Sequence, residues 1–351
     1  MQIDLIGTAI ALLTLFGIYA LMALSLNLEY GVAGVPNFGK ALFVSLGAYT
    51  AGWTYTRLLP LLAGQQVIDP CGGSTMAQAL AMRSQIMKTM PTVGLTNFLI
   101  TLGLALIVGG VVGWVASYPA LRLKEEWFLG LVLLVSAEIV RIVVRSYPPI
   151  ICGSNGLSGI AQPFNWLDNK TLSSLCFAAL ILVCVAAVYF YCERLVRSPF
   201  GRLLKAIREN DTVAAELGKD VARRRGQVMF IGSALAALAG VFFVVNTGYA
   251  SANDYAVSLT LDVWVMVVLG GLGNNRGALL GALLITVLDR ITAVTAIQMN
   301  MLGIAWEFNY ARYILFGVIL LLMLRYRPQG LLPEPARTTL AHAQLDAKAS
   351  G

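Results

Sequence analysis

Apolar stretches long enough to cross a lipid bilayer recur along the whole of this 351-residue chain. The first runs from 5 to 26, and a helix of that length, at ~1.5 Å per residue, spans the ~30 Å hydrocarbon core. Only 12% of the residues are charged, whereas soluble domains carry roughly 25%, so lipid is the solvent that suits this composition. We therefore predict an all-α, polytopic integral membrane protein with about eight to ten transmembrane helices.

About nine stretches meet the length requirement for a membrane span. Two of them are weaker, because one carries Glu138, Arg141 and Arg145 and the other is short and ends in glycines. We expect the first stretch to be a retained helix and not a cleaved signal peptide, since no basic residue precedes it. The predicted spans lie at 5–26, 38–59, 94–118, 127–145, 172–192, 227–247, 257–273, 278–297 and 309–325.

The distribution of Lys and Arg predicts the orientation in the membrane. The segment 193–226 is the most basic part of the chain, and loops rich in Lys and Arg remain in the cytoplasm. Alternation of the spans then places 60–93 and 146–171 outside and the C-terminus inside. The net charge of +7 is thus explained by topology, without a nucleic-acid partner. We expect one transmembrane domain over 1–332 and a polar, disordered tail over 333–351.

Histidine and cysteine usage argues against an enzyme or a metal centre. The one histidine, His342, lies in the predicted tail, so the membrane core has no imidazole for catalysis or metal binding. Cys71 and Cys152 both fall in predicted outer loops. Because the sequence does not supply their separation, their pairing stays open, and free thiols are the interpretation we favour. The other cysteines share one apolar stretch and are expected to be ordinary membrane-helix residues: Cys176, Cys184 and Cys192.

The basic loop 193–226 contains a pattern of two short amphipathic helices. Ser198 is a good N-cap residue, and Pro199 suits the first helical position. Asp211 is predicted to cap a second helix, and Gly218 fits the C′ position at its end. A solvated connector would explain the arginines but not these caps. The pattern favours a docking surface at the membrane.

Two Gly- and Asn-rich breaks interrupt the apolar pattern, at 31–39 and at 270–277. Paired breaks in the two halves of a chain are typical of a transport pathway. The first break nearly matches a phosphate-binding loop, but Ala41 stands where that motif needs a hydroxyl and no strand precedes it. We therefore predict helix breaks and not a nucleotide site. Candidate pathway or helix-break residues are Asn27, Gly34, Asn37, Gly39, Gly271 and Gly273.

Ionisable side chains within predicted spans are costly in lipid and are candidates for function. Glu138 and Arg141 are three residues apart on one helix face, so they can form an ion pair that fixes the helix or can line the pathway. Asp262 lies in a later span and is a further candidate.

A series of short stretches, in a fixed order from about residue 20 to residue 331, resembles the branched-chain amino acid permease family of the LivM type. No single stretch is specific, but the ordered set is. The basic loop resembles the coupling loop of ABC importer permeases, where Ala214, Ala215 and Gly218 match residues that sit in a groove of the ATPase. The matching stretches are 26–34, 45–50, 118–123, 137–141, 153–160, 198–221, 267–273 and 327–331.

The resemblance implies a type II-like ABC importer permease for branched-chain or other neutral amino acids, in a prokaryotic inner membrane. It implies a second, related permease subunit, two cytosolic ATPases and an extracytoplasmic substrate-binding protein. ATP and Mg²⁺ would be held by the ATPases, and this chain would bind no cofactor. Further candidates in the coupling loop are Arg202, Lys205 and Glu209.

Two other interpretations stay open at this point. One keeps the same machinery but changes the cargo to urea, short amides or a sugar. The other is a secondary transporter that works without an ATPase, for which the ionisable residues in the spans are the supporting observation.

Overall fold

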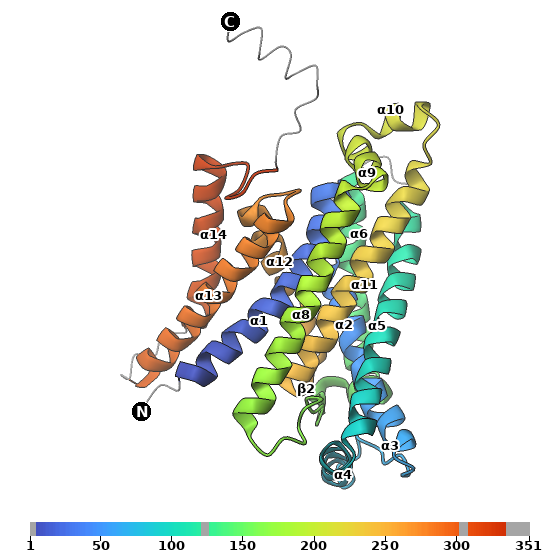
Figure 1. Cartoon of the computed structure of the whole chain (residues 1–351), viewed down its shortest axis with the longest axis vertical. Helices are drawn as coiled ribbons and strands as arrows, with labels where there is room; N and C mark the ends of the chain where they lie inside the picture. The colour runs from blue at the N-terminus through green and yellow to red at the C-terminus, as the bar shows by residue number, and fades with distance from the viewer. Residues whose placement is uncertain (1–4, 121–125, 302–307, 335–351) are drawn as a thin grey trace, which may run out of the picture.

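Long helices dominate the chain, as the recurrent apolar stretches predict. The computed structural model describes residues 5–120, 126–301 and 308–334. Within these ranges, six helices are long and apolar enough to cross a membrane (Figure 1). The protein is thus a polytopic, helical membrane protein. These helices are α1 (Leu5–Leu26), α5 (Pro91–Ala120), α6 (Glu126–Ser146), α8 (Lys170–Arg197), α11 (Val221–Thr247) and α13 (Asn275–Met301).

The three remaining predicted spans also contain helices. The helix α2 (Lys40–Trp53) continues through a π-helical turn, η2 (Thr54–Leu58), into α3 (Leu59–Leu62). The helices α12 (Val257–Gly270) and α14 (Phe308–Tyr326) have 14 and 19 residues. Each of the predicted stretches therefore contains helix, although α12 is short for a full crossing.

The helix α11 lies at the centre of the bundle and packs against α5, α2 and α1. Small residues allow the backbones to come close, which is how helices associate in lipid. A side chain at Gly47 of α2 would collide with the backbone of Ala237. Gly109 and Gly113 of α5 leave room in the same way for Ala237 and Ser233. The sequence of α11 therefore suits a buried central helix.

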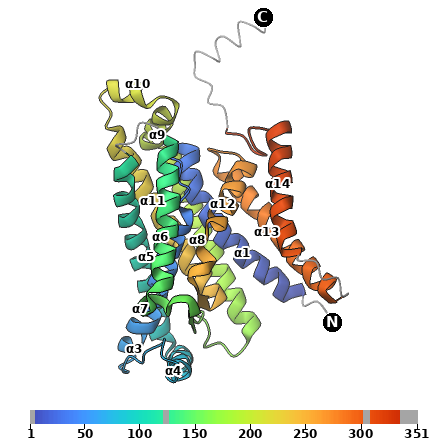
Figure 2. The same ribbon diagram turned by 180° about the vertical axis from the view of Figure 1, so that it is seen from behind.

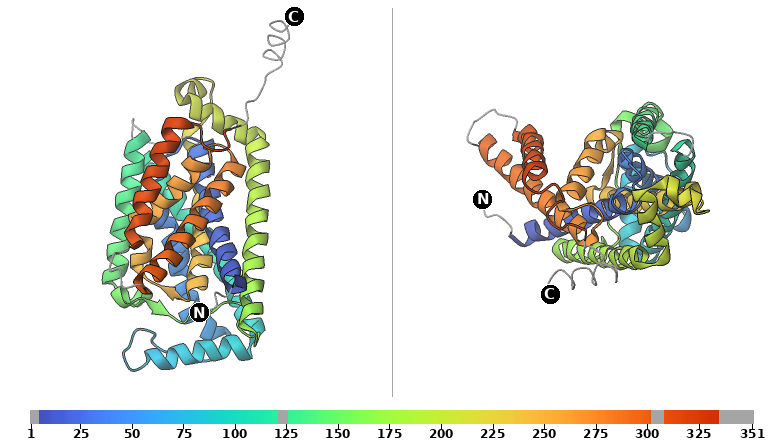
Figure 3. Two further views of the ribbon diagram at one scale, coloured as in Figure 1. Left: turned by 90° about the vertical axis from the view of Figure 1, so that its left-hand side faces the viewer. Right: turned by 90° about the horizontal axis from the view of Figure 1, so that it is seen from above.

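The two ends of the bundle carry different short elements. At one end lie α9 (Pro199–Glu209) and α10 (Asp211–Glu216), which connect α8 to α11 (Figure 1). At the other end α4 (Met76–Thr89) lies across the bundle, close to the level of α3 (Figure 3). The short helix α7 (Pro148–Ile151) is at this same end, where the view from behind shows it below α6 (Figure 2).

A two-stranded antiparallel ribbon of two residues per strand accompanies the helices, and the all-α prediction is confirmed. The strands β1 (Leu157–Ser158) and β2 (Tyr249–Ala250) pair at the α4 end of the bundle. The reason is local: both segments lie outside regular helices, and their pairing satisfies backbone groups that would otherwise lack partners.

A disulfide joins Cys71 to Cys152, with the two Cα atoms 5.0 Å apart. Our preference for free thiols at these positions is therefore wrong. The bond connects residues that are 81 positions apart, and only the folding of the loop before α4 against α7 brings them together. Cys176, Cys184 and Cys192 are free cysteines, as expected.

Candidate functional site

The first predicted break follows α1. The helix runs into a π-helical turn, η1 (Asn27–Val32), after which the chain turns at Gly34 with a φ of +73°. Glycine has no Cβ and adopts this left-handed conformation at little cost, so the turn favours glycine at position 34. Gly39 ends the break, immediately before α2, and its backbone N–H donates to the Asn37 side chain over 2.9 Å.

The second predicted break connects α12 to α13. Gly271 and Gly273 have φ values of +119° and +78°, so both conformations favour glycine. Behind this break the two helices pack closely: a Cβ at Gly277 would lie 2.6 Å from the carbonyl oxygen of Gly270. Both breaks therefore occur where the Gly- and Asn-rich segments predicted them.

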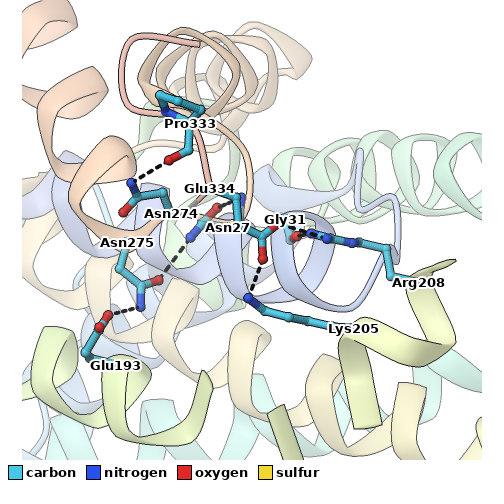
Figure 4. Close-up of polar contacts among 10 residues, drawn as sticks. Asn27, Gly31, Glu193, Lys205, Arg208, Asn274, Asn275, Pro333 and Glu334 are labelled. Atoms are coloured by element: carbon cyan, nitrogen blue, oxygen red, sulfur yellow. Dashed lines mark hydrogen bonds and ion pairs between the residues drawn. The ribbon is translucent and has the colours of Figure 1, made fainter. Parts of the chain in front are cut away.

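The two breaks meet in space, although the sequence places them in opposite halves of the chain (Figure 4). The Asn27 side-chain amide donates to the side-chain oxygen of Asn275 over 3.0 Å, and the Gly273 backbone N–H donates to the Asn27 side-chain oxygen over 2.9 Å. A Cβ at Gly31 would lie 2.5 Å from the Gly273 nitrogen. We call this cluster the break junction.

The helix α9 of the basic loop is seated directly on the first break. Arg208 donates a hydrogen bond to the backbone carbonyl of Gly31, as Figure 4 shows. The absence of a side chain at Gly34 makes room for Arg208, because a Cβ there would lie 2.9 Å from the arginine Cγ. The loop and the break therefore cannot move independently without breaking these contacts.

The segment 327–334, which follows α14, lies across the second break, and we call it the strap. Its backbone N–H groups at Leu331 and Leu332 donate to the carbonyl groups of Leu269 and Gly270 over 3.0 and 2.9 Å. These are carbonyl groups that the end of α12 leaves without helical partners. The Asn274 side chain donates to carbonyl oxygens of the same segment.

Glu334 joins this strap to α9. Its carboxylate pairs with Lys205 and lies 2.8 Å from a guanidinium nitrogen of Arg208. Partial burial opposes ionisation, but the hydrogen bonds and charges of the two basic groups outweigh it and lower the pKa of Glu334 below its usual 4.5. The tail predicted at 333–351 thus starts within the site. Beyond Glu334 it lies outside the described residues.

The end of α8 completes the junction. The Asn275 side-chain amide donates to Glu193 over 3.1 Å, and Glu193 in turn pairs with Arg197 over 2.6 Å. The junction therefore connects η1, α8, α9, the α12–α13 connection and the strap (Figure 4).

A buried ion pair lies beside the first break and was not predicted. Lys40 Nζ is 2.6 Å from Glu29 Oε2, and both side chains are fully buried. Asn37 donates to the same carboxylate over 2.8 Å, and Lys40 donates to Ser25 over 2.5 Å. Lys40, which resembled the lysine of a phosphate loop, is thus occupied by an internal carboxylate. A Lys at the start of an apolar span was the available signal, because such a charge needs a partner.

Other candidate residues lie away from the break junction or at its margin. Glu138 and Arg141 form the predicted ion pair on α6, at 2.7 Å, and both are partly exposed. Asp262 lies on α12 and is also partly exposed. Glu138 and Arg141 therefore pair with each other on α6.

In the loop, the predicted helix caps are largely confirmed. Ser198 caps α9 and accepts a hydrogen bond from the Gly201 N–H. Asn210, and not Asp211, caps α10, because its side chain faces the free N–H of Val213 while Asp211 is the first helical residue. Gly218 follows this helix with a φ of +74°. Of the other loop candidates, Ala214 is buried, Lys205 is half-buried, and the rest are exposed: Arg202, Glu209 and Ala215.

Comparison with known proteins agrees with this architecture. A family model described as "Branched-chain amino acid transport system / permease component" matches residues 8–324. The probable branched-chain amino acid transport permease protein LivM of Methanocaldococcus jannaschii is 38% identical over 336 residues, which cover 95% of each chain.

More distant relatives carry other names. The LivH permease protein of the high-affinity branched-chain amino acid transport system of Salmonella typhimurium is 24% identical, with 92% of this chain and 93% of that protein covered. The fructose import permease protein FruG of Bifidobacterium longum is 26% identical, with 79% of this chain and 81% of that protein covered. No solved structure matches the chain. The extent of the family match, together with the bundle and its paired breaks, shows that the chain belongs to the branched-chain amino acid transport permease family.

Proposed function

We propose that the chain is the transmembrane permease subunit of an ATP-driven ABC importer for branched-chain or other neutral amino acids. The observation that carries this proposal is the direct connection between the basic loop and the break junction. Arg208 bonds the first break at Gly31, and Glu334 joins α9 to the strap over the second. A force applied to the loop therefore reaches both helix breaks, which is what coupling to an external ATPase requires.

The tip of the loop has the chemistry of a docking surface. Val213 and Leu217 are 48% and 72% exposed, and Ala215 and Gly218 beside them are small and exposed. Apolar side chains grouped at the exposed tip of a loop mark protein interaction sites. The occupant we propose is the cytosolic ATPase, which would hold ATP and Mg²⁺ on its own residues.

The remaining partners follow from the same proposal. They are a second, related permease, a second ATPase and an extracytoplasmic binding protein that delivers the cargo. Similarity to permeases named LivM and LivH supports a pair of related subunits. ATP-driven closure of the ATPases would move the two loops and change the side to which the central path opens. Glu138 and Arg141 of α6 are our candidates for lining that path.

The proposed orientation puts the basic loop and the C-terminus in the cytoplasm of a prokaryotic cell. Excess Lys and Arg in the loop supports this side. The disulfide supports it independently, because Cys71 and Cys152 lie at the opposite end of the bundle and disulfides persist in oxidising compartments.

A sugar is the second candidate cargo, favoured by the similarity to a fructose import permease. Uptake of labelled leucine, isoleucine, valine and fructose by cells that express the complete gene cluster distinguishes the two. Uptake of fructose alone, without competition by leucine, would reject the amino-acid assignment.

Co-purification tests the dependence on an ATPase. The tagged chain in mild detergent is expected to bring down two ATPases and a second permease. The variants Val213→Asp and Leu217→Asp should each lose the ATPases while remaining inserted. The matched control is Val67→Asp, which changes an exposed apolar residue at the opposite end of the bundle and should retain them. A wild-type chain that purifies without an ATPase even after crosslinking would instead favour a secondary transporter.

A further inference from the structure

A groove of about 780 Å³ runs between α5, α8 and α11, close to α9. Its walls are mostly apolar and include Trp114, Tyr191 and Phe230. Val111 and Val115 on the same wall are 50% and 61% exposed, so the residues that the structure describes do not cover this side of the bundle. In a membrane protein such a surface is in contact with lipid chains or with another protein.

The groove has a basic end, where the membrane helices meet the loop. Arg194 of α8 and Arg224 of α11 line it there, and none of the described lining residues is acidic. Arg224 lies over the ring of Phe200 at 5.8 Å and donates to Gln227 over 3.0 Å, which holds the guanidinium in place. The side chain of Arg194 forms no hydrogen bond or ion pair with any other described residue.

This arrangement matches one class of molecule. An acidic phospholipid has a phosphate-bearing headgroup with a net negative charge, and it has acyl chains that need an apolar surface. Arginine binds phosphate oxygens through parallel N–H groups, and basic pockets between membrane helices bind acidic headgroups. Trp and Tyr side chains are common at the depth where headgroup and acyl chain meet, which is where Trp114 and Tyr191 would lie.

We infer that this groove is a binding site for an anionic phospholipid, with its headgroup on Arg194 and Arg224 and an acyl chain along the apolar wall. The charge of the site selects the acidic headgroup over a zwitterionic one. The site does not depend on the cargo proposed above, because none of the groove residues belongs to the break junction. A lipid held there would contact α8 and α11, the two helices that carry the loop.

Native mass spectrometry of the full chain tests the inference. The protein is stripped of lipid in detergent and then offered phosphatidylglycerol or phosphatidylcholine with identical acyl chains. We expect the wild type to retain phosphatidylglycerol preferentially. The double variant Arg194→Gln/Arg224→Gln should bind it roughly 10- to 30-fold more weakly, given the usual strength of attraction between a basic residue and an anionic membrane.

The matched control is Lys219→Gln/Arg223→Gln, which removes the same charge from the same end of the bundle at exposed positions outside the groove. It should retain phosphatidylglycerol like the wild type. Equal loss in both double variants, or equal retention of the two lipids by the wild type, overturns the site.

Fluorescence supplies a second readout that does not depend on the arginine variants folding well. Phosphatidylglycerol brominated on its acyl chains should quench tryptophan emission more strongly in the wild type than in Trp114→Phe, since the groove would hold the chain beside Trp114. Unchanged quenching in Trp114→Phe contradicts the site. In the assembled complex, retention of the lipid supports the inference, whereas its complete exclusion means that a protein covers the groove and refutes it.

Discussion

The side-chain amide of Asn27 donates to the side-chain oxygen of Asn275 across 248 positions of sequence. This one hydrogen bond joins the two helix breaks, and Asn27 also accepts from the backbone of Gly273. Both asparagines are buried. Through these two bonds Asn27 links the two halves of the chain at the loop end of the bundle.

Replacing Asn27 with Ala should lower the stability of the protein by about 1–3 kcal/mol, because it leaves two buried polar groups without a partner. Thermal unfolding in detergent measures this. The control Asn253→Ala removes an exposed asparagine side chain and should have little effect. An Asn27→Ala protein as stable as the wild type would show that water replaces the amide and that the junction is not a tight contact.

Replacing Lys40 with Met should destabilise the protein by about 3–5 kcal/mol, since the Glu29 carboxylate is left charged and buried. The double variant Glu29→Gln/Lys40→Met should recover much of the loss, because no unpaired charge remains. Unfolding temperature and the amount of protein in the membrane fraction report the change. The control Lys88→Met, at an exposed position of α4, should behave like the wild type. If the double variant is as unstable as Lys40→Met, the cost lies in packing and not in the unpaired charge.

The disulfide predicts a labelling pattern. After denaturation without reductant, a maleimide reagent should modify only the three free cysteines, and all five after reduction. Cys71→Ser should also lower the unfolding temperature, because a disulfide typically contributes about 2–4 kcal/mol. Intact mass counts the modified thiols. Labelling of all five cysteines before reduction, in protein purified without reducing agent, would contradict the bond.

Glu334 predicts a pH-dependent contact. Its pKa is lowered in the folded protein, so its pairing with Lys205 and Arg208 stabilises the fold at pH values above the usual 4.5 and is lost as the pH falls below it. The unfolding temperature of Glu334→Gln should therefore be below that of the wild type at pH 7. This deficit should shrink in acid.

The control for this prediction is Glu209→Gln, since Glu209 is exposed on α9 and makes no ion pair with other described residues. It should show no deficit at either pH. A Glu334→Gln protein with no deficit at pH 7 would mean that the strap is held by its backbone bonds and not by the carboxylate.

Local features of the fold could be predicted from the sequence, because they depend on neighbouring residues. The residue preferences of helix ends predict the N-cap at Ser198 and the glycine at position 218. The Gly- and Asn-rich segments predict the breaks. The partners across the bundle could not be predicted. The contacts of Asn27, Lys40 and Glu334 depend on how helices pack, and periodicity carries no information on which side chains then meet. The disulfide between Cys71 and Cys152 could not be predicted for the same reason.

The strap also has a consequence for how the protein is made. Leu331 and Leu332 close over the end of α12, and Glu334 reaches α9, but this segment is synthesised after every membrane helix that the structure describes. During translation, α9 and the α12–α13 connection therefore lack these contacts until the segment that follows α14 has left the ribosome. A chain that stopped before this segment would insert its helices but would lack the ion pairs of Glu334 with Lys205 and Arg208 that hold the basic loop.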